Sequence, residues 1–139
     1  MNTLSTHLQA ATLLLFAILP TPADTISVNF VGTDSNGAIP NSLNPAESAG
    51  IVPASNWTNA TGSDGSLGNL ANDSGTATTT DLSWNGQSTW SWERSGDSVP
   101  NNPNGTLFNG YLDTSGNDGS HTLSVTDVPY SQYDVIVYL

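Results

Sequence analysis

The chain of 139 residues contains no cysteine and no lysine, and Arg94 is its only arginine. Without cysteine there is no disulfide framework, no thiolate metal site and no cysteine nucleophile. The 12 acidic residues leave a formal net charge of −11, although only 9% of the residues are charged. Because nucleic acids and anionic membranes are bound through Lys and Arg, the sequence predicts neither as a partner.

The longest apolar run lies near the N-terminus. Residues Ala10–Leu19, AATLLLFAIL, form a run too short to span a bilayer, and Pro20-Thr21-Pro22-Ala23 follows. This is typical of a secretory signal peptide, although no Lys or Arg precedes the run. We expect residues 1–23 to be removed, leaving a secreted or cell-surface protein with no membrane span in the mature chain. The alternative is an N-terminal anchor that stays uncleaved.

Amphipathic helices are missing from the rest of the sequence, where short alternating runs stand between turns rich in Gly, Asn, Asp, Ser and Pro. In Thr25–Val31, TISVNFV, apolar and polar residues alternate as in a half-buried strand. His121–Val125 predicts another strand, with Leu123 and Val125 pointing inward.

Two further runs complete the predicted fold. Leu107–Leu112 predicts a strand interrupted at Gly110, where we expect a bulge or a close backbone contact. Tyr133–Leu139, YDVIVYL, is continuously apolar apart from Asp134 and predicts a central strand buried on both faces. The sequence therefore predicts an all-β domain, a two-sheet antiparallel sandwich over residues 24–139. Because the chain ends within this last run, we expect the sandwich to be incomplete at its C-terminus.

The segment DLSWNGQSTWSWER holds three of the four tryptophans. Asn85-Gly86 favours a type I′ turn, which predicts a β-hairpin. Its two strands would be Thr78–Trp84 and Gln87–Trp92. A two-residue loop places Trp84 on one face and Trp90 and Trp92 on the other, whereas a five-residue loop would gather all three indoles on one face.

The three indoles favour two different roles. Trp84 alternates with Leu82, as a core residue does. Trp90 and Trp92 stand among polar residues and could either be core residues or form an exposed platform that stacks on sugar rings. Arg94 could hold a carboxylate of a ligand or pair with a neighbouring acidic side chain. Trp90, Trp92 and Arg94 are therefore the candidate ligand-binding residues.

Several segments together carry a resemblance to a known group of proteins. They are, in order, ISVNF, VPASNW, LSW, STW, GYLD, TLSV and YDVIVYL. The chain from Ile26 to Leu139 resembles exported β-sandwich modules of environmental bacteria such as planctomycetes and verrucomicrobia. The resemblance implies a galactose-binding-like or jelly-roll sandwich, often in proteins with a C-terminal sorting signal. It implies no catalytic or binding residue.

Signatures of catalysis are absent from the sequence. There is no G-x-S-x-G motif, and His121 lies in a predicted strand edge among hydroxyl residues. Glu47, Glu93 and the aspartates offer no spacing that singles out a pair of carboxylates for glycoside hydrolysis. The sequence therefore predicts a protein without enzymatic activity.

A structural calcium ion is the only cofactor that the sequence suggests. Asp113, Ser115, Asn117 and Asp118 place oxygen ligands close together in DTSGNDG, and Ca²⁺ binds such oxygens. The segment lacks the glycine position and the final glutamate of an EF-hand loop, so an ordinary Asx-rich turn is the alternative.

Two functions fit these patterns. The first is a non-catalytic extracellular module that binds polysaccharide through exposed aromatic residues. The second is a structural or adhesive surface domain without a small ligand, in which every tryptophan belongs to the core. The exposure of Trp90 and Trp92 distinguishes the two hypotheses, because a stacking platform must be accessible in the free protein.

Overall fold

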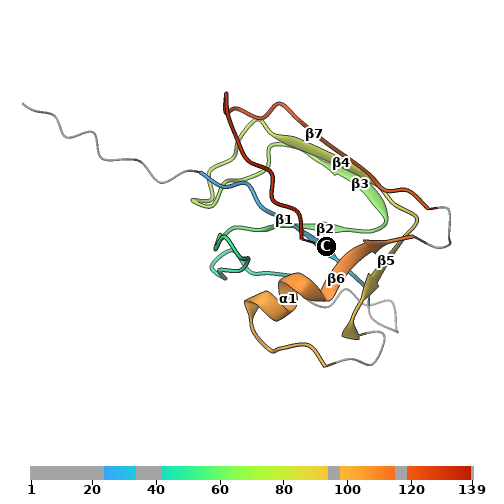
Figure 1. Cartoon of the computed structure of the whole chain (residues 1–139). Helices are drawn as coiled ribbons and strands as arrows, with labels where there is room; N and C mark the ends of the chain where they lie inside the picture. Colours follow the sequence, from blue (N-terminus) through green and yellow to red (C-terminus); the bar gives the residue numbers. More distant parts are fainter. Residues whose placement is uncertain (1–23, 34–41, 94–97, 115–118, 139) are drawn as a thin grey trace, which may run out of the picture.

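The computed structural model describes residues 24–33, 42–93, 98–114 and 119–138. Within them the chain is mostly strand and turn, with one short helix, so the predicted β-rich fold is confirmed (Figure 1). The elements are β1 (Val28–Val31), β2 (Thr58–Thr61), β3 (Asp64–Leu67), β4 (Asp81–Asn85), β5 (Ser88–Ser91), α1 (Pro103–Asn109), β6 (Gly110–Asp113) and β7 (Thr122–Thr126). The predicted signal segment, residues 1–23, lies outside the described residues, and its cleavage stays a prediction.

The described strands form three small sheets. One has the order β3-β4-β7 and another pairs β5 with β6, and both are antiparallel. The third pairs β1 with β2 in parallel, with Val28 beside Thr58. The prediction of a purely antiparallel sandwich was therefore wrong for β1 and β2. The long connection between β1 and β2 permits the parallel pairing, because it can return the chain to the start of the sheet.

Two apolar clusters stabilise the fold. Trp57 is the largest member of the first cluster, and its indole Nε1 donates a hydrogen bond of 2.8 Å to the Ala54 carbonyl. Trp84 is the largest member of the second, where it meets Phe30 edge to face at a centroid distance of 5.9 Å. The buried members of the two clusters are Leu43, Ala49, Ala54, Trp57 and Leu107, and Ala60, Leu70, Leu82 and Trp84. The prediction that Leu82 and Trp84 are core residues is confirmed.

The hairpin predicted at Asn85-Gly86 is not formed. β4 pairs with β3 and β7, whereas β5 pairs with β6, so both predicted registers were wrong. Neither Asn85 nor Gly86 has the positive φ that a type I′ turn requires. Instead the Gly86 amide donates a hydrogen bond of 2.7 Å to the Ser63 carbonyl, which carries the chain past β3 and into another sheet.

The predicted strand Leu107–Leu112 is a helix followed by a strand. Asn102 caps α1 by accepting a hydrogen bond from the Gly105 amide at 2.9 Å, and a proline follows it in the first turn. The expected close backbone contact at Gly110 is confirmed, since a Cβ there would lie 2.6 Å from the Phe30 carbonyl oxygen. Glycine at this position lets β6 start against β1.

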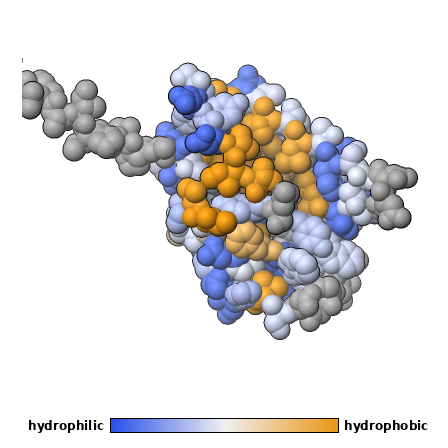
Figure 2. Space-filling view, in the orientation of Figure 1, coloured by the Kyte–Doolittle hydropathy of each residue, from blue (hydrophilic) through white to orange (hydrophobic). Residues whose placement is uncertain are grey.

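The C-terminal part of the chain differs most from expectation. β7 is a strand, but Leu123 and Val125 are 51% and 55% exposed, so their predicted inward orientation was wrong. Tyr133–Tyr138 is not a buried central strand: it forms no strand pairing, and Val135 is 75% exposed. Figure 2 shows the apolar side chains gathered on this face of the molecule. Burial on both faces would require neighbouring strands, and the described residues supply none here.

Thr80 offers a test of the core. Its side chain is 1% exposed, and its Oγ1 makes no hydrogen bond within the described residues. A buried hydroxyl without a partner costs about 1–3 kcal/mol, and valine has nearly the same shape. We expect Thr80→Val to raise the free energy of unfolding by about 1 kcal/mol, measured from urea denaturation.

The neighbouring threonine provides a matched control. Thr78 Oγ1 donates to the Leu70 carbonyl at 2.7 Å and accepts from the Thr80 amide at 3.1 Å. Thr78→Val should therefore lower the free energy of unfolding by about 1 kcal/mol. Equal changes of the same sign in the free energy of unfolding of the two variants would contradict the cost assigned to the Thr80 hydroxyl.

Candidate functional site

An open groove beside Trp92 is the strongest candidate for a binding site. The groove has a volume of about 570 Å³ and runs between the end of β5 and the start of α1. Trp92 lies at the wall of this groove and is 53% exposed. The lining residues are Trp92, Ser98, Val99, Pro100, Asn102, Asn104, Gly105 and Phe108.

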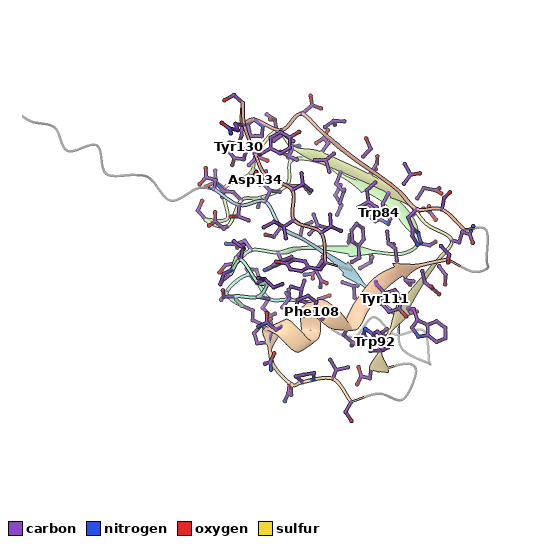
Figure 3. All side chains as sticks on the ribbon, viewed as in Figure 1. Trp84, Trp92, Phe108, Tyr111, Tyr130 and Asp134 are labelled. Atoms are coloured by element: carbon purple, nitrogen blue, oxygen red, sulfur yellow. The ribbon has the colours of Figure 1, made fainter. Side chains whose placement is uncertain are left out.

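Trp92 makes one contact through its backbone and one through its ring. Its backbone amide donates a hydrogen bond of 2.9 Å to the Asn109 carbonyl, at the last residue of α1. Its ring lies 6.1 Å from the ring of Tyr111 at an interplanar angle of 49°. Figure 3 shows the two side chains beside one another near β5 and β6. The backbone of Trp92 is therefore bonded to the end of α1, and its exposed ring has Tyr111 as a neighbour.

Asn109, the last residue of α1, connects the helix to the segment that carries Trp92. The side chain is 1% exposed, and its Oδ1 accepts a hydrogen bond of 3.1 Å from the Glu93 amide. Its Nδ2 donates to the Glu93 carboxylate at 3.4 Å. These bonds hold the residue that follows Trp92 against the end of α1.

Two asparagines supply the polar side of the groove. Asn102 Oδ1 accepts from the Gly105 amide at 2.9 Å, and Asn104 Oδ1 accepts from the Gly50 amide at 2.8 Å. Because the donors are backbone N–H groups, the oxygen of each side chain is assigned. The Nδ2 groups make no hydrogen bond within the described residues and remain available as donors to a ligand.

Phe108 forms an apolar part of the lining. It is 42% exposed and packs edge to face against Tyr138, with ring centroids 5.3 Å apart. The Tyr138 hydroxyl in turn accepts a hydrogen bond of 3.2 Å from the Ile51 amide. The C-terminal segment thus supports the groove through Phe108.

Tyr111 remains a neutral hydrogen-bonding group at physiological pH. Burial raises the pKa of its phenol above the ordinary value of 10.0, and the carboxylate of Asp113 raises this pKa further. The phenol beside Trp92 therefore adds no charge to the site at neutral pH.

A second depression lies on the outer face of the β3-β4-β7 sheet and has a volume of about 350 Å³. Its lining is Ser66, Leu67, Gly68, Asp81, Leu82, Ser83, Ser124 and Thr126. This lining contains no aromatic side chain, so nothing here offers a stacking surface.

The predicted ligand-binding residues fall in different surroundings. Trp92 lines the groove, whereas Trp90 is half-buried in β5, opposite Tyr111 of β6. Arg94 lies outside the described residues. Nothing in the sequence pattern singled out Asn102, Asn104 or Phe108 as residues of the site. The pair Asn102-Pro103, a cap followed by a first-turn proline, could have indicated the helix that carries them.

The predicted calcium site is described only at its first residue. Asp113 ends β6 and pairs with Ser88 of β5. The other predicted ligands, Ser115, Asn117 and Asp118, lie outside the described residues. In the parts of the chain that the structure covers, no three His, Cys, Asp or Glu side chains gather as a metal site would require. Calcium binding stays a prediction.

Comparison with protein-family models, with curated proteins and with solved structures found no match. Among the described residues, none of the helices has the length and apolar character needed to cross a bilayer. The geometry of the Trp92 groove is therefore the feature that points to a function.

Proposed function

We propose that this protein is a secreted or cell-surface module without catalytic activity, which binds polysaccharide in the Trp92 groove. The observation that carries the proposal is an indole, 53% exposed, at the wall of an open groove. A sugar ring has an apolar face of C–H groups and a rim of hydroxyls. A flat aromatic ring beside the amide donors of Asn102 and Asn104 complements both features.

The charge of the groove favours a neutral glycan. None of its described lining residues carries a charge, and Glu93 follows Trp92 directly. The net charge of −11 would also repel a sulfated or phosphorylated polymer. Uncharged hydroxyl-rich chains are therefore the proposed ligands.

The proposal includes the setting of this site. The domain would be a two-sheet sandwich of the jelly-roll or galactose-binding-like kind, exported after removal of residues 1–23. The antiparallel pairing of β3, β4 and β7 and of β5 with β6 supports such an arrangement. The resemblance to exported bacterial modules supports the extracellular location.

A structural or adhesive surface domain without a small ligand is the rival. Trp57 and Trp84 favour it, because both indoles are buried and bond to backbone carbonyls. Trp92 separates the two functions, since a core role does not account for its exposed ring.

Acrylamide quenching of tryptophan fluorescence tests the proposal. We expect partial quenching in the free protein, because Trp92 is accessible while Trp57 and Trp84 are protected. A soluble neutral polysaccharide should reduce the quenching constant, and dextran sulfate at the same concentration should not. If a panel of neutral glucans, mannans, galactans and xylans leaves quenching unchanged, the rival function stands.

A further inference from the structure

The strand β7 has one edge that no other described strand covers. It is the outer strand of the β3-β4-β7 sheet and pairs only with β4 (Figure 1). All five of its residues, Thr122–Thr126, are exposed. An open edge presents backbone N–H and C=O groups that can pair with another strand.

This edge lacks the devices that usually prevent such pairing. Residues 119–126 include no Asp, Glu, Lys, Arg or Pro, in a chain whose net charge is −11. The strand at the opposite edge, β3, differs because it begins with Asp64. Charged residues and proline discourage pairing between sheet edges, so β7 is an edge at which two acidic chains can approach.

We propose that two copies of this chain pair through β7, antiparallel to one another and centred on Ser124. The sequence Thr-Leu-Ser-Val-Thr has nearly the same character in both directions. Centred on Ser124, this register sets Thr122 opposite Thr126 and Leu123 opposite Val125 of the second copy. Opposed threonines and opposed aliphatic side chains both stabilise an antiparallel pair. A two-fold axis through Ser124 makes the contact self-complementary.

The residues that flank β7 complete this register. His121 precedes the strand and Asp127 follows it. In the proposed pairing, His121 of one copy lies opposite Asp127 of the other copy. An imidazole N–H is a hydrogen-bond donor and a carboxylate is an acceptor. The two ends of the paired strands therefore each bring a donor and an acceptor together.

The apolar face of the sheet supports the same partner. Leu123 and Val125 pair with Trp84 and Leu82 of β4 and project to the same side of the sheet. Trp84 and Leu82 are buried there, whereas Leu123 and Val125 are half exposed. Pairing through β7 would form one continuous six-stranded sheet and cover these two side chains with their counterparts. Because the contact is a single short strand, the dimer should dissociate on dilution.

Sedimentation of the purified full chain tests the pairing. We expect the wild-type protein to shift from monomer to dimer as its concentration rises. Ser124→Lys would place two lysines directly opposite each other, and should weaken dimerisation at least tenfold because like charges there are destabilising. Ser66→Lys is the matched control, since Ser66 is exposed on β3, the strand at the opposite edge of the same sheet. It should dimerise as the wild type does.

Disulfide trapping tests the register. The chain has no cysteine, so Ser124→Cys introduces a single thiol. Residues directly opposite in an antiparallel pair have Cα atoms about 4.5–5.5 Å apart, within the range that a disulfide bridges. Mild oxidation should therefore link Ser124→Cys into a covalent dimer, whereas Ser66→Cys should remain a monomer on a denaturing gel.

Three results would overturn the proposal. A wild-type chain that stays monomeric at all concentrations would exclude self-pairing, and would leave the edge to a strand of another protein. Dimers or larger assemblies that persist in Ser124→Lys would place the contact elsewhere. Equal trapping of Ser124→Cys and Ser66→Cys would mean that the link forms by random collision.

Discussion

Trp92→Ala is expected to weaken binding of a neutral polysaccharide by about 2 kcal/mol, which is roughly thirtyfold in Kd. The indole belongs to a residue that is 53% exposed at the wall of the groove, and its ring lies beside that of Tyr111. Alanine removes the flat face on which a sugar ring would stack, while the amides of Asn102 and Asn104 remain. Isothermal titration calorimetry with the glycan that protects the protein from acrylamide would give the two dissociation constants.

Two control variants distinguish stacking from a general loss of structure. Trp92→Tyr keeps an aromatic face and should retain most of the affinity. Ile51→Ala removes an aliphatic side chain that is 80% exposed and does not line the groove, so it should bind as the wild type does. Unchanged affinity in Trp92→Ala would show that this groove does not hold the glycan.

Trp84→Ala is expected to lower the free energy of unfolding by about 4 kcal/mol. Trp84 is 6% exposed, contacts Phe30 and fills the space above Gly65, where a Cβ would lie 2.5 Å from the indole. Alanine would create a cavity. It would also remove the indole N–H that donates to the Gly62 carbonyl. Because small domains have a total stability of about 5–15 kcal/mol, the variant should be largely unfolded at modest urea concentrations.

The same substitution at Trp92 is the matched control for Trp84. Trp92 belongs to neither apolar cluster, so Trp92→Ala should lower the free energy of unfolding by less than about 1 kcal/mol. Trp84→Phe should have an intermediate effect, because it keeps a ring beside Phe30 but loses the hydrogen bond to Gly62. Similar destabilisation by alanine at Trp84 and Trp92 would contradict the division into core and groove tryptophans.

Part of the candidate site could be predicted from the chain. Trp90 and Trp92 stand among polar residues, which left both a core role and an exposed role open, and the structure exposes Trp92 while Trp90 is half-buried. Asn102, Asn104 and Phe108 could not be predicted in the same way. Asn104 reaches its place through a bond to the Gly50 amide, and Phe108 through packing against Tyr138. Contacts between residues so far apart in sequence leave no local signal.

The β-hairpin predicted at Asn85-Gly86 does not form for a similar reason. The dipeptide favours a tight turn when its two flanking strands can pair with one another. Here β4 already has partners on both edges, β3 with Leu67 beside Leu82 and β7 with Val125 beside Leu82. No edge of β4 is left for β5, and the local preference therefore gives way to the tertiary pairing.

The sequence by itself determined that this protein is β-rich, strongly acidic and free of thiols, and that Leu82 and Trp84 lie in the core. Alternation, turn residues and composition are local properties, so they can be read from the chain. Only the tertiary structure decided which strands pair, that Leu107 lies in a helix, and that Leu123, Val125 and Tyr133–Val137 are exposed. Burial of an apolar strand depends on whether another element covers it, and that depends on contacts across the whole chain.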